Sequence, residues 1–353
     1  MKLIELFNNA DLHQNKIHRP YVIAEIGVNH EGSMDTAKRL VKEAKEGGAD
    51  AVKFQTYKAD TIASKDSPAY WDTSKEPTLS QHELFKRHDK FWKDEMQELK
   101  DYCDKVDIEF MSTPFDVESA EFLNDMMDVF KISSSDITNK PFIEYICSFE
   151  KPIILSTGAS DLEEVQDAVN WIKPFNVSLA LLHCVLNYPT PDKNANLGMI
   201  SGLKKAFPDN IIGYSDHTLP KEMKVCEIAT LLGAIIIEKH FTMDKKLPGP
   251  DQKCSIEPKE LASLIEQIRN IEQSLGDGIK KPSKLESEPR QFKRRGIYAA
   301  TDLKSGKVLL EPDVMFLAPS AENSSVEDWP DFEGKKIASD IPKGSVISRS
   351  NLI

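Results

Sequence analysis

Strand-like and helix-like segments alternate eight times between residues 21 and 275, and this repeat constrains the fold more than any other feature. Runs rich in β-branched and aromatic residues are typical of strands. We expect strands at YVIAEIG (21–27), AVKFQ (51–55), IEFMST (108–113), VFKIS (129–133), PIILST (152–157), VSLALLHC (177–184), IIGYSD (211–216) and AIIIEKH (234–240). We expect the intervening helices at 34–47, 94–105, 117–127, 139–149, 161–172, 194–206, 221–232 and 258–275. Eight such units predict a closed (β/α)8 TIM barrel, whereas an open doubly wound sheet would not normally need so many.

The texture of the sequence changes after Gly276. Turn residues then separate short strand signals, as in LKSGKVLLEPD and IPKGSVISRSN, and we expect no helix there. The predicted organisation is a barrel domain at 1–281, a linker at 282–293 and a small β-rich domain at 294–353.

Charge and hydropathy exclude several classes of function. The net charge is -12, and no cluster of lysines and arginines is interleaved with aromatic residues, so nucleic acid is not an expected partner. No window approaches 18 uninterrupted apolar residues, and the first residues lack a secretory apolar run, so we expect a cytoplasmic protein without a membrane partner. The five cysteines are widely spaced without a C-x-x-C pair, which predicts buried thiols and not disulfides or a zinc ribbon.

Polar residues stand at the carboxyl end of every expected strand. In a (β/α)8 barrel the chemistry takes place at these ends. A polar residue at one strand end is usually a solvated end or a satisfied core group, but eight together on one face predict a reaction chamber. In chain order they are Glu25; Lys53 and Gln55; Ser112 and Thr113; Lys131, Ser133 and Ser134; Ser156 and Thr157; His183, followed by Asn187 and Tyr188; Ser215, Asp216 and His217; and Glu238 and His240.

The residue types at these ends indicate the chemistry. His217 and His240 follow neighbouring strands, with Glu238 nearby, which suits a divalent metal with few protein ligands and open positions for substrate. Lys53 and Lys131 are two cations set among hydroxyl groups, which fits a phosphate, although each lysine is also compatible with a salt-bridged or partly solvated side chain. The hydroxyls are those of Thr113, Ser134, Ser156 and Ser215.

Glu25 stands alone among apolar neighbours in VIAEIGVNH. It is a candidate general acid or base, and a buried glutamate paired with Lys53 is the structural alternative.

Several motifs, in order along the chain, resemble the sialic acid synthase family, which includes N-acetylneuraminate, legionaminate and pseudaminate synthases and spore-coat polysaccharide proteins. The motifs are AEIGVNHEG, VKFQ, STPFD, FKIS, ILSTGAS, LHCVLNYPTP, GYSDHT, EKHFT and PGPD, and the C-terminal segment resembles an antifreeze-like (SAF) domain. The resemblance implies a transferase that condenses phosphoenolpyruvate with an N-acylated mannosamine-type sugar, most like N-acetylneuraminate synthase. The products would be a nine-carbon 2-keto-3-deoxy acid and phosphate. It also implies a Mn²⁺ or Mg²⁺ cofactor and a homodimer in which each small domain covers the partner's barrel.

The same resemblance assigns roles to individual residues. It places the metal on His217 and His240 and the essential glutamate on Glu25. The implied phosphoenolpyruvate contacts are Lys53, Thr113, Lys131, Ser134, Ser156 and Ser215. The implied sugar-side residues are Gln55, Tyr188 and Asp251.

Three positions depart from the family pattern. Leu186 replaces an asparagine that contacts phosphoenolpyruvate, and Gln252 replaces a histidine found in many relatives. Ala318-Pro319 stands where the family has an arginine that reaches the sugar's acyl amide in the partner's site. The identity of the sugar is therefore open.

Three alternatives remain. One is a related phosphoenolpyruvate-dependent synthase for an unacylated or phosphorylated aldose. Another is a Schiff-base aldolase that uses Lys53, Lys131 or Lys239. The third is a non-catalytic sugar-binding or structural barrel, which would have no need of Glu25 together with both histidines.

Overall fold

The computed structural model describes residues 2–9, 19–71, 73, 76–221, 223–320 and 324–353. The chain divides into two compact units, Met1–Gly278 and Ile279–Ile353. In the described part of the chain, no helix is long and apolar enough to cross a membrane.

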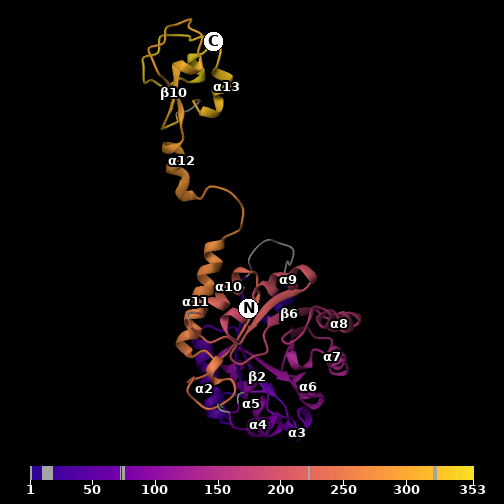
Figure 1. Ribbon diagram of the computed structural model, residues 1–353. Coiled ribbons are helices and arrows are strands. Elements are labelled where there is room, and N and C mark those ends of the chain that lie inside the picture. Colours follow the sequence, from indigo (N-terminus) through magenta and orange to yellow (C-terminus); the bar gives the residue numbers. More distant parts are fainter. Residues whose placement is uncertain (1, 10–18, 72, 74–75, 222, 321–323) are drawn as a thin grey trace. The chain divides into compact units, whose positions relative to one another are not determined.

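The first unit is built around one sheet of eight parallel strands (Figure 1). Their order is β3-β2-β1-β8-β7-β6-β5-β4, and the two end strands, β3 and β4, lie against each other. Because neighbours follow chain order and β8 pairs with β1, the sheet curls into a barrel and does not reverse as a doubly wound sheet would. This confirms the predicted fold class. The strands are β1 (Tyr21–Gly27), β2 (Ala51–Thr56), β3 (Glu109–Pro114), β4 (Phe130–Ile132), β5 (Ile153–Ser156), β6 (Leu179–Cys184), β7 (Ile211–Asp216) and β8 (Ile236–His240).

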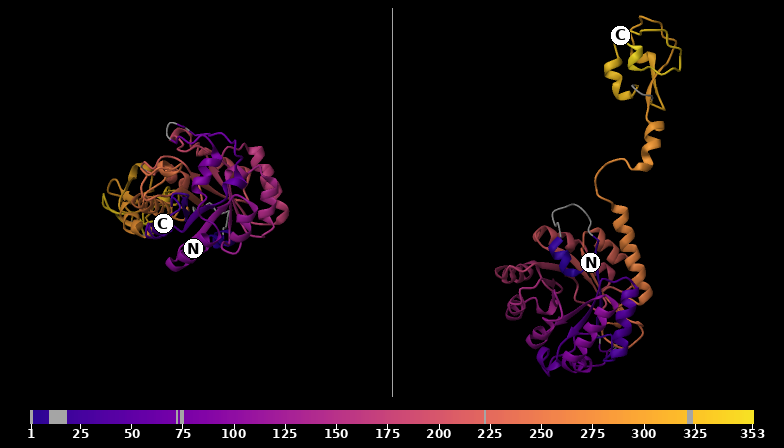
Figure 2. Two further views of the ribbon diagram at one scale, coloured as in Figure 1. Left: turned by 90° about the horizontal axis from the view of Figure 1, so that it is seen from below. Right: turned by 180° about the vertical axis from the view of Figure 1, so that it is seen from behind.

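Helices lie on the outside of this sheet (Figures 1 and 2). The eight expected helices are α2 (Met34–Glu46), α5 (Lys93–Val106), α6 (Val117–Leu123), α7 (Lys140–Cys147), α8 (Leu162–Ile172), α9 (Gly198–Ala206), α10 (Lys224–Leu231) and α11 (Pro258–Leu275). Three short helices were not predicted, and they are α1 (Leu3–Asn9), α3 (Ala59–Ile62) and α4 (Gln81–His88).

Helix α2 illustrates how the sequence specifies these elements. The Ser33 hydroxyl accepts a hydrogen bond from the Thr36 backbone N–H at 3.2 Å, which caps the first turn. Its buried residues recur every three or four positions, so one stripe of the helix packs on the barrel, and they are Ala37, Leu40, Val41 and Ala44.

The barrel strands are buried on both faces. Every residue of β1, β6, β7 and β8 is buried. Such strands carry apolar side chains almost throughout, because both the interior and the helix layer exclude water. The ionisable residues at the ends of β1 and β8 are therefore buried as well, and they need partners there.

The second unit has a separate core of its own. Strands β9 (Gly296–Ala299) and β10 (Val314–Leu317) pair antiparallel, and isolated bridges such as Leu303↔Ile341 extend the β structure. The prediction of no helix after Gly276 is wrong, because α12 (Ser287–Lys293) and α13 (Trp329–Phe332) are present. Helix α12 lies within the segment that we predicted to be the linker. Its residues are all exposed, so the apolar periodicity that would have indicated it is absent.

Candidate functional site

The strand register brings the predicted residues to one level of the barrel. Glu25 on β1 is the Cα partner of Lys53 on β2 and of His240 on β8. On the other side of β8, Glu238 is the partner of Ser215 on β7. Side chains from distant parts of the sequence therefore meet at the carboxyl ends of these four strands.

Two lysines and two glutamates form a buried charge network. The Lys53 ammonium lies 2.6 Å from Glu25 Oε2 and 3.7 Å from Glu238 Oε2, and it donates a hydrogen bond to Thr113 Oγ1 at 3.0 Å. The Lys131 ammonium lies 3.7 Å from Glu238 Oε1, which also accepts a hydrogen bond from the Ser215 hydroxyl at 3.0 Å. Glu238 thus lies between the two cations. An anionic ligand that displaced Glu238 would find both lysines already positioned.

Burial and charge give the four groups different proton affinities. Burial raises the pKa of Glu25 to about 7, against the opposing effect of Lys53, and Glu238 raises it further. Burial also acts on Glu238, but Lys131 and Lys53 outweigh it and hold its pKa below the ordinary value. Burial lowers the pKa of Lys131, whereas the two carboxylates overcome burial at Lys53 and raise its pKa. Glu25 is therefore the carboxylate best suited to exchange a proton near neutral pH.

Hydroxyl groups line the same region. Within the described part of the chain, the buried Ser156 hydroxyl has no hydrogen-bond partner. Ser134 Oγ accepts a hydrogen bond from the Gly158 N–H at 2.9 Å. A buried hydroxyl without a partner costs free energy unless a ligand or water bonds to it, so the free Ser156 hydroxyl indicates a site for a polar ligand.

The two histidines lie side by side, with ring centroids 5.3 Å apart. His217 Nδ1 is 2.8 Å from the Val185 carbonyl oxygen, and donation to this oxygen leaves Nε2 free to accept or to ligate. His240 Nδ1 is buried and, among the residues described, has no hydrogen-bond partner, while Asp251 Oδ2 lies 3.8 Å away. Burial lowers the pKa of His240 well below its ordinary value, so the ring is neutral, as a metal ligand must be.

These features fit a divalent cation with few protein ligands. No group of three or more His, Cys, Asp or Glu side chains able to hold a metal is found in the described ranges. A cation held by His217 and His240 would keep its other coordination positions for substrate and water, as metal ions in catalytic sites do.

Three predicted sugar-side residues lie around the same network. The Tyr188 ring lies against the His217 ring at a tilt of 38°, with centroids 4.0 Å apart. Gln55 donates a hydrogen bond to Glu25 Oε1 at 3.3 Å. Burial raises the pKa of Asp251 to about 6, against the opposing effects of His217 and Lys53. Each of the three residues therefore contacts or electrostatically influences the catalytic candidates.

Other polar strand-end residues face away from the chamber, contrary to the expectation that all would line it. Ser112 bonds to Thr56 at 2.6 Å, and Thr157 donates to the Leu182 carbonyl at 3.0 Å. His183 Nε2 is bonded to the Ala195 carbonyl at 2.7 Å. Asp216 is also on this outer side. The cause is the alternation of side chains along a strand, which sends neighbours to opposite faces.

Residues at two of the regions that depart from the family pattern form hydrogen bonds within the chain. Gln252 is buried, and its amide oxygen accepts a hydrogen bond from Thr242. Asn187, next to Leu186, is exposed and donates to the Pro189 carbonyl at 3.1 Å.

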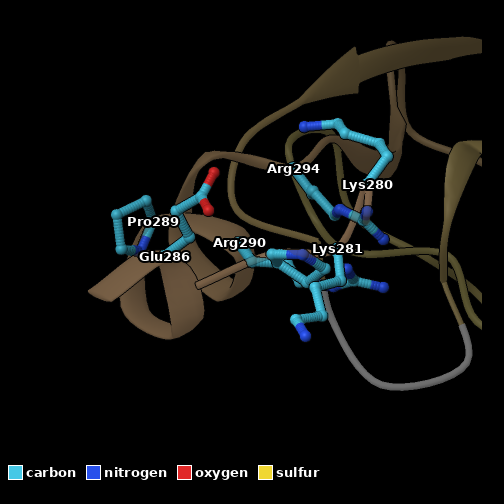
Figure 3. Close-up of a pocket in the computed structure, with 7 residues that line it drawn as sticks. Lys280, Lys281, Glu286, Pro289, Arg290 and Arg294 are labelled. Atoms are coloured by element: carbon cyan, nitrogen blue, oxygen red, sulfur yellow. The ribbon is translucent and has the colours of Figure 1, made fainter. Parts of the chain in front are cut away.

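A separate hollow lies on the second unit (Figure 3). None of the predicted site residues lines it, and its lining residues are all exposed. They are Lys280, Lys281, Pro282, Glu286, Pro289, Arg290 and Arg294.

Comparisons with known proteins place the chain in a family. The NeuB family matches residues 40–280, and the SAF domain matches residues 294–353. The N,N'-diacetyllegionaminic acid synthase of Legionella pneumophila is 42% identical over 307 residues, which is 85% of each chain. The N-acetylneuraminate-9-phosphate synthase of Mus musculus is 31% identical over 336 residues, 95% of this chain and 93% of the relative.

A solved structure also supports membership of this family. The N-acetylneuraminic acid (sialic acid) synthetase of Leptospira borgpetersenii, crystallised with citrate, has a TM-score of 0.68 and 36% identity, over 77% of this chain and 90% of its own. The resemblance stated from the sequence motifs is thereby confirmed. The chain belongs to the NeuB family and carries a SAF domain at its C-terminal end.

Proposed function

We propose that the protein condenses phosphoenolpyruvate with an N-acylated mannosamine-type sugar to give a sialic-acid-like nine-carbon acid and phosphate. The observation that carries this proposal is the buried network in which Glu238 lies between Lys53 and Lys131. Two cations suit the carboxylate and phosphate of phosphoenolpyruvate, and the unpartnered Ser156 hydroxyl stands at the end of β5, the strand next to that of Lys131. The relatives, which are named as synthases of sialic-acid-type sugars, support the reaction class.

The side chains have distinct roles in this reaction. Lys53, Lys131, Thr113, Ser134, Ser156 and Ser215 bind phosphoenolpyruvate, and Gln55, Tyr188 and Asp251 orient the sugar. His217 and His240 would hold Mn²⁺ or Mg²⁺, and the ion would polarise the aldehyde of the open-chain sugar. The enol carbon of phosphoenolpyruvate forms a bond to that aldehyde carbon. The aldehyde oxygen takes up a proton and becomes a hydroxyl. Water then adds to the resulting cationic carbon and passes a proton to Glu25. The new hydroxyl on that carbon loses its proton as the bond between the carbon and the phosphate oxygen breaks, which gives the keto group and releases phosphate.

Phosphate release from phosphoenolpyruvate tests the proposal. The aldose panel contains N-acetylmannosamine, a diacetylated 6-deoxy sugar, unacylated mannose and a phosphorylated N-acetylmannosamine. We expect release with an acylated sugar, loss of release with chelator and recovery with Mn²⁺. Because Ala318 cannot donate a hydrogen bond to an acyl amide, we also expect weak discrimination against the unacylated sugar. The proposal would be overturned if none of the four aldoses supported phosphate release, or if the release were insensitive to chelator.

Two alternatives have a specific observation in their favour. The mouse relative is named a 9-phosphate synthase, so the phosphorylated sugar in the panel tests that substrate class. The lowered pKa of Lys131 would suit a Schiff-base nucleophile. Covalent trapping at Lys131 by borohydride and pyruvate would support an aldolase, and its absence would support the metal-dependent synthase.

We also propose that the protein is a homodimer in which each SAF domain covers the barrel of its partner. An open barrel would expose the reacting groups to water, and a covering domain would exclude it.

A further inference from the structure

We propose that Asp216 and Lys239 are positioning residues that fix His217 and His240 in place. This inference rests on the proposed metal site. The two residues form a buried ion pair, with Asp216 Oδ2 2.7 Å from Lys239 Nζ and side-chain exposures of 2% and 1%. Asp216 is the last residue of β7 and immediately precedes His217, and Lys239 immediately precedes His240 at the end of β8.

The pair occupies the outer face of the two strands. Asp216 and Lys239 are Cα partners, and theirs is the last rung of the β7–β8 ladder. Because side chains alternate along a strand, Ser215 and Glu238 before them meet in the chamber, and the two histidines after them lie next to each other. The ion pair therefore joins β7 and β8 at their last paired residues, directly before the two histidines.

Asp216 holds the backbone that follows His217. Its Oδ1 accepts hydrogen bonds from the Thr218 N–H and the Tyr214 hydroxyl, both at 2.9 Å. Its Oδ2 accepts a hydrogen bond from the Thr218 hydroxyl at 3.0 Å and lies 3.4 Å from Cys226 Sγ. This carboxylate thus satisfies several donors at once and fixes residue 218 by two of its groups.

Lys239 completes the hold on the same residue. Its ammonium donates to the Thr218 carbonyl at 2.5 Å, so the N–H, hydroxyl and carbonyl of Thr218 are all bonded to the pair. The carbonyl of His217 in turn accepts from the Thr190 N–H at 2.8 Å. The backbone on both sides of His217 is therefore fixed, and the side chain of Lys239 ties the strand that carries His240 to it.

Burial of two charges costs desolvation free energy, and backbone hydrogen bonds already join β7 and β8. Replacement of such a pair by neutral residues of similar volume is often neutral or stabilising, so stability alone does not require it. Groups that orient metal ligands typically change metal affinity by about 10- to 100-fold when they are replaced. Metal affinity therefore separates a positioning role from a purely structural one.

The test compares Mn²⁺ binding by calorimetry, without substrates, in the full-length wild type and in the double variant Asp216→Asn/Lys239→Met. This double variant leaves no unpaired buried charge and nearly keeps side-chain volume. The control is Asp192→Asn/Lys221→Met, which removes an exposed 2.7 Å pair between the connections after β6 and β7. We expect the Mn²⁺ Kd to rise about 10- to 100-fold in the buried double variant and to stay within about twofold in the control. Thermal melting reports whether each variant is folded.

A milder variant covers the case in which the double variant does not fold. Asp216→Asn/Lys239→Gln also leaves no unpaired buried charge and keeps a hydrogen-bond donor beside Thr218, and we expect it to retain more of the Mn²⁺ affinity than the methionine-containing variant. A folded double variant with wild-type affinity would overturn the inference while leaving the metal site intact. If the wild type itself binds no Mn²⁺, the proposed metal site falls, and the inference falls with it. If neither variant folds, the pair is a requirement of the fold, and the positioning role is rejected.

Discussion

Glu25 and Glu238 are carboxylates of one buried network whose pKa values move in opposite directions. Burial raises both values, but Glu238 lies near two lysines and accepts a hydrogen bond from Ser215, so its pKa falls. Glu25 has a single lysine partner and a like-charged neighbour, so its pKa rises to about 7. The same environment therefore yields one permanent anion and one proton acceptor.

This contrast predicts a pH dependence. Because Glu25 must be ionised to accept a proton, kcat/KM should fall as pH decreases through about 7. Glu238 raises the pKa of Glu25, so Glu238→Gln should lower that pKa and move the acid limb to lower pH. Rate–pH profiles with the same two substrates measure the shift, and Glu98→Gln, which alters an exposed glutamate, is the control. An unmoved acid limb in Glu238→Gln would assign the limb to another group.

The lysines give a second prediction at this scale. Lys53→Met or Lys131→Met removes a charge while nearly keeping volume. A hydrogen bond to a charged group contributes about 1.5–3 kcal/mol, so KM for phosphoenolpyruvate should rise roughly ten- to hundredfold. KM for the sugar should change much less. Steady-state kinetics with each substrate varied in turn measure both KM values. An equal rise in the two values would refute the assignment of these lysines to phosphoenolpyruvate.

The sequence predicted which strand ends carry the site but not which side each residue faces. Side chains alternate between the two faces of a strand, so one residue known to face inward fixes the side of its neighbours. With Ser215 inside, Asp216 is outside and His217 is inside, and with Glu238 inside, Lys239 is outside and His240 is inside. Contacts such as that between Asp216 and the Thr218 backbone depend on loop geometry, which no pattern of residue types specifies.

Among the elements, the strands were the best predicted. The bounds of β1 and β7 agree with the sequence analysis, because buried strands are marked by continuous apolar runs. The sequence analysis missed the short helices α1, α3, α4, α12 and α13. Helices of four to eight residues show too few turns for apolar periodicity to be visible, and α12 buries no residue at all.

Close packing of strands makes a prediction at the element scale. A Cβ at Gly213 on β7 would lie 2.4 Å from Leu182 Cδ2 and 2.6 Å from the Ile236 carbonyl oxygen, on the two neighbouring strands. Gly213→Ala should therefore spread β6 and β8 and lower the free energy of unfolding by about 1–3 kcal/mol. Gly202→Ala in helix α9 meets nothing within 4 Å and should raise it by roughly 0.5–1 kcal/mol. Denaturant titration measures both, and equal effects would contradict the packing argument.

At the scale of the whole molecule, the second unit has its own core and is not needed to complete the barrel's core. A lid over the site would explain its presence, and a twofold exchange of lids would make each site depend on two chains. Truncation after Lys281 leaves a barrel that has all its catalytic residues but no SAF domain. Full-length Glu25→Ala has a SAF domain but lacks the catalytic glutamate. Each protein alone should be nearly inactive.

Mixed dimers of the two proteins decide between exchange and a lid that acts within its own chain. In the exchanged arrangement, the SAF domain of the Glu25→Ala chain covers the live truncated barrel, so co-expression should restore part of the activity. The measurement is phosphate release by mixed dimers whose composition is confirmed by mass. In the control, a truncated Glu25→Ala chain replaces the full-length Glu25→Ala chain; it brings no SAF domain and should restore nothing. Mixed dimers with no more activity than the separate proteins would show that no lid is supplied by the partner.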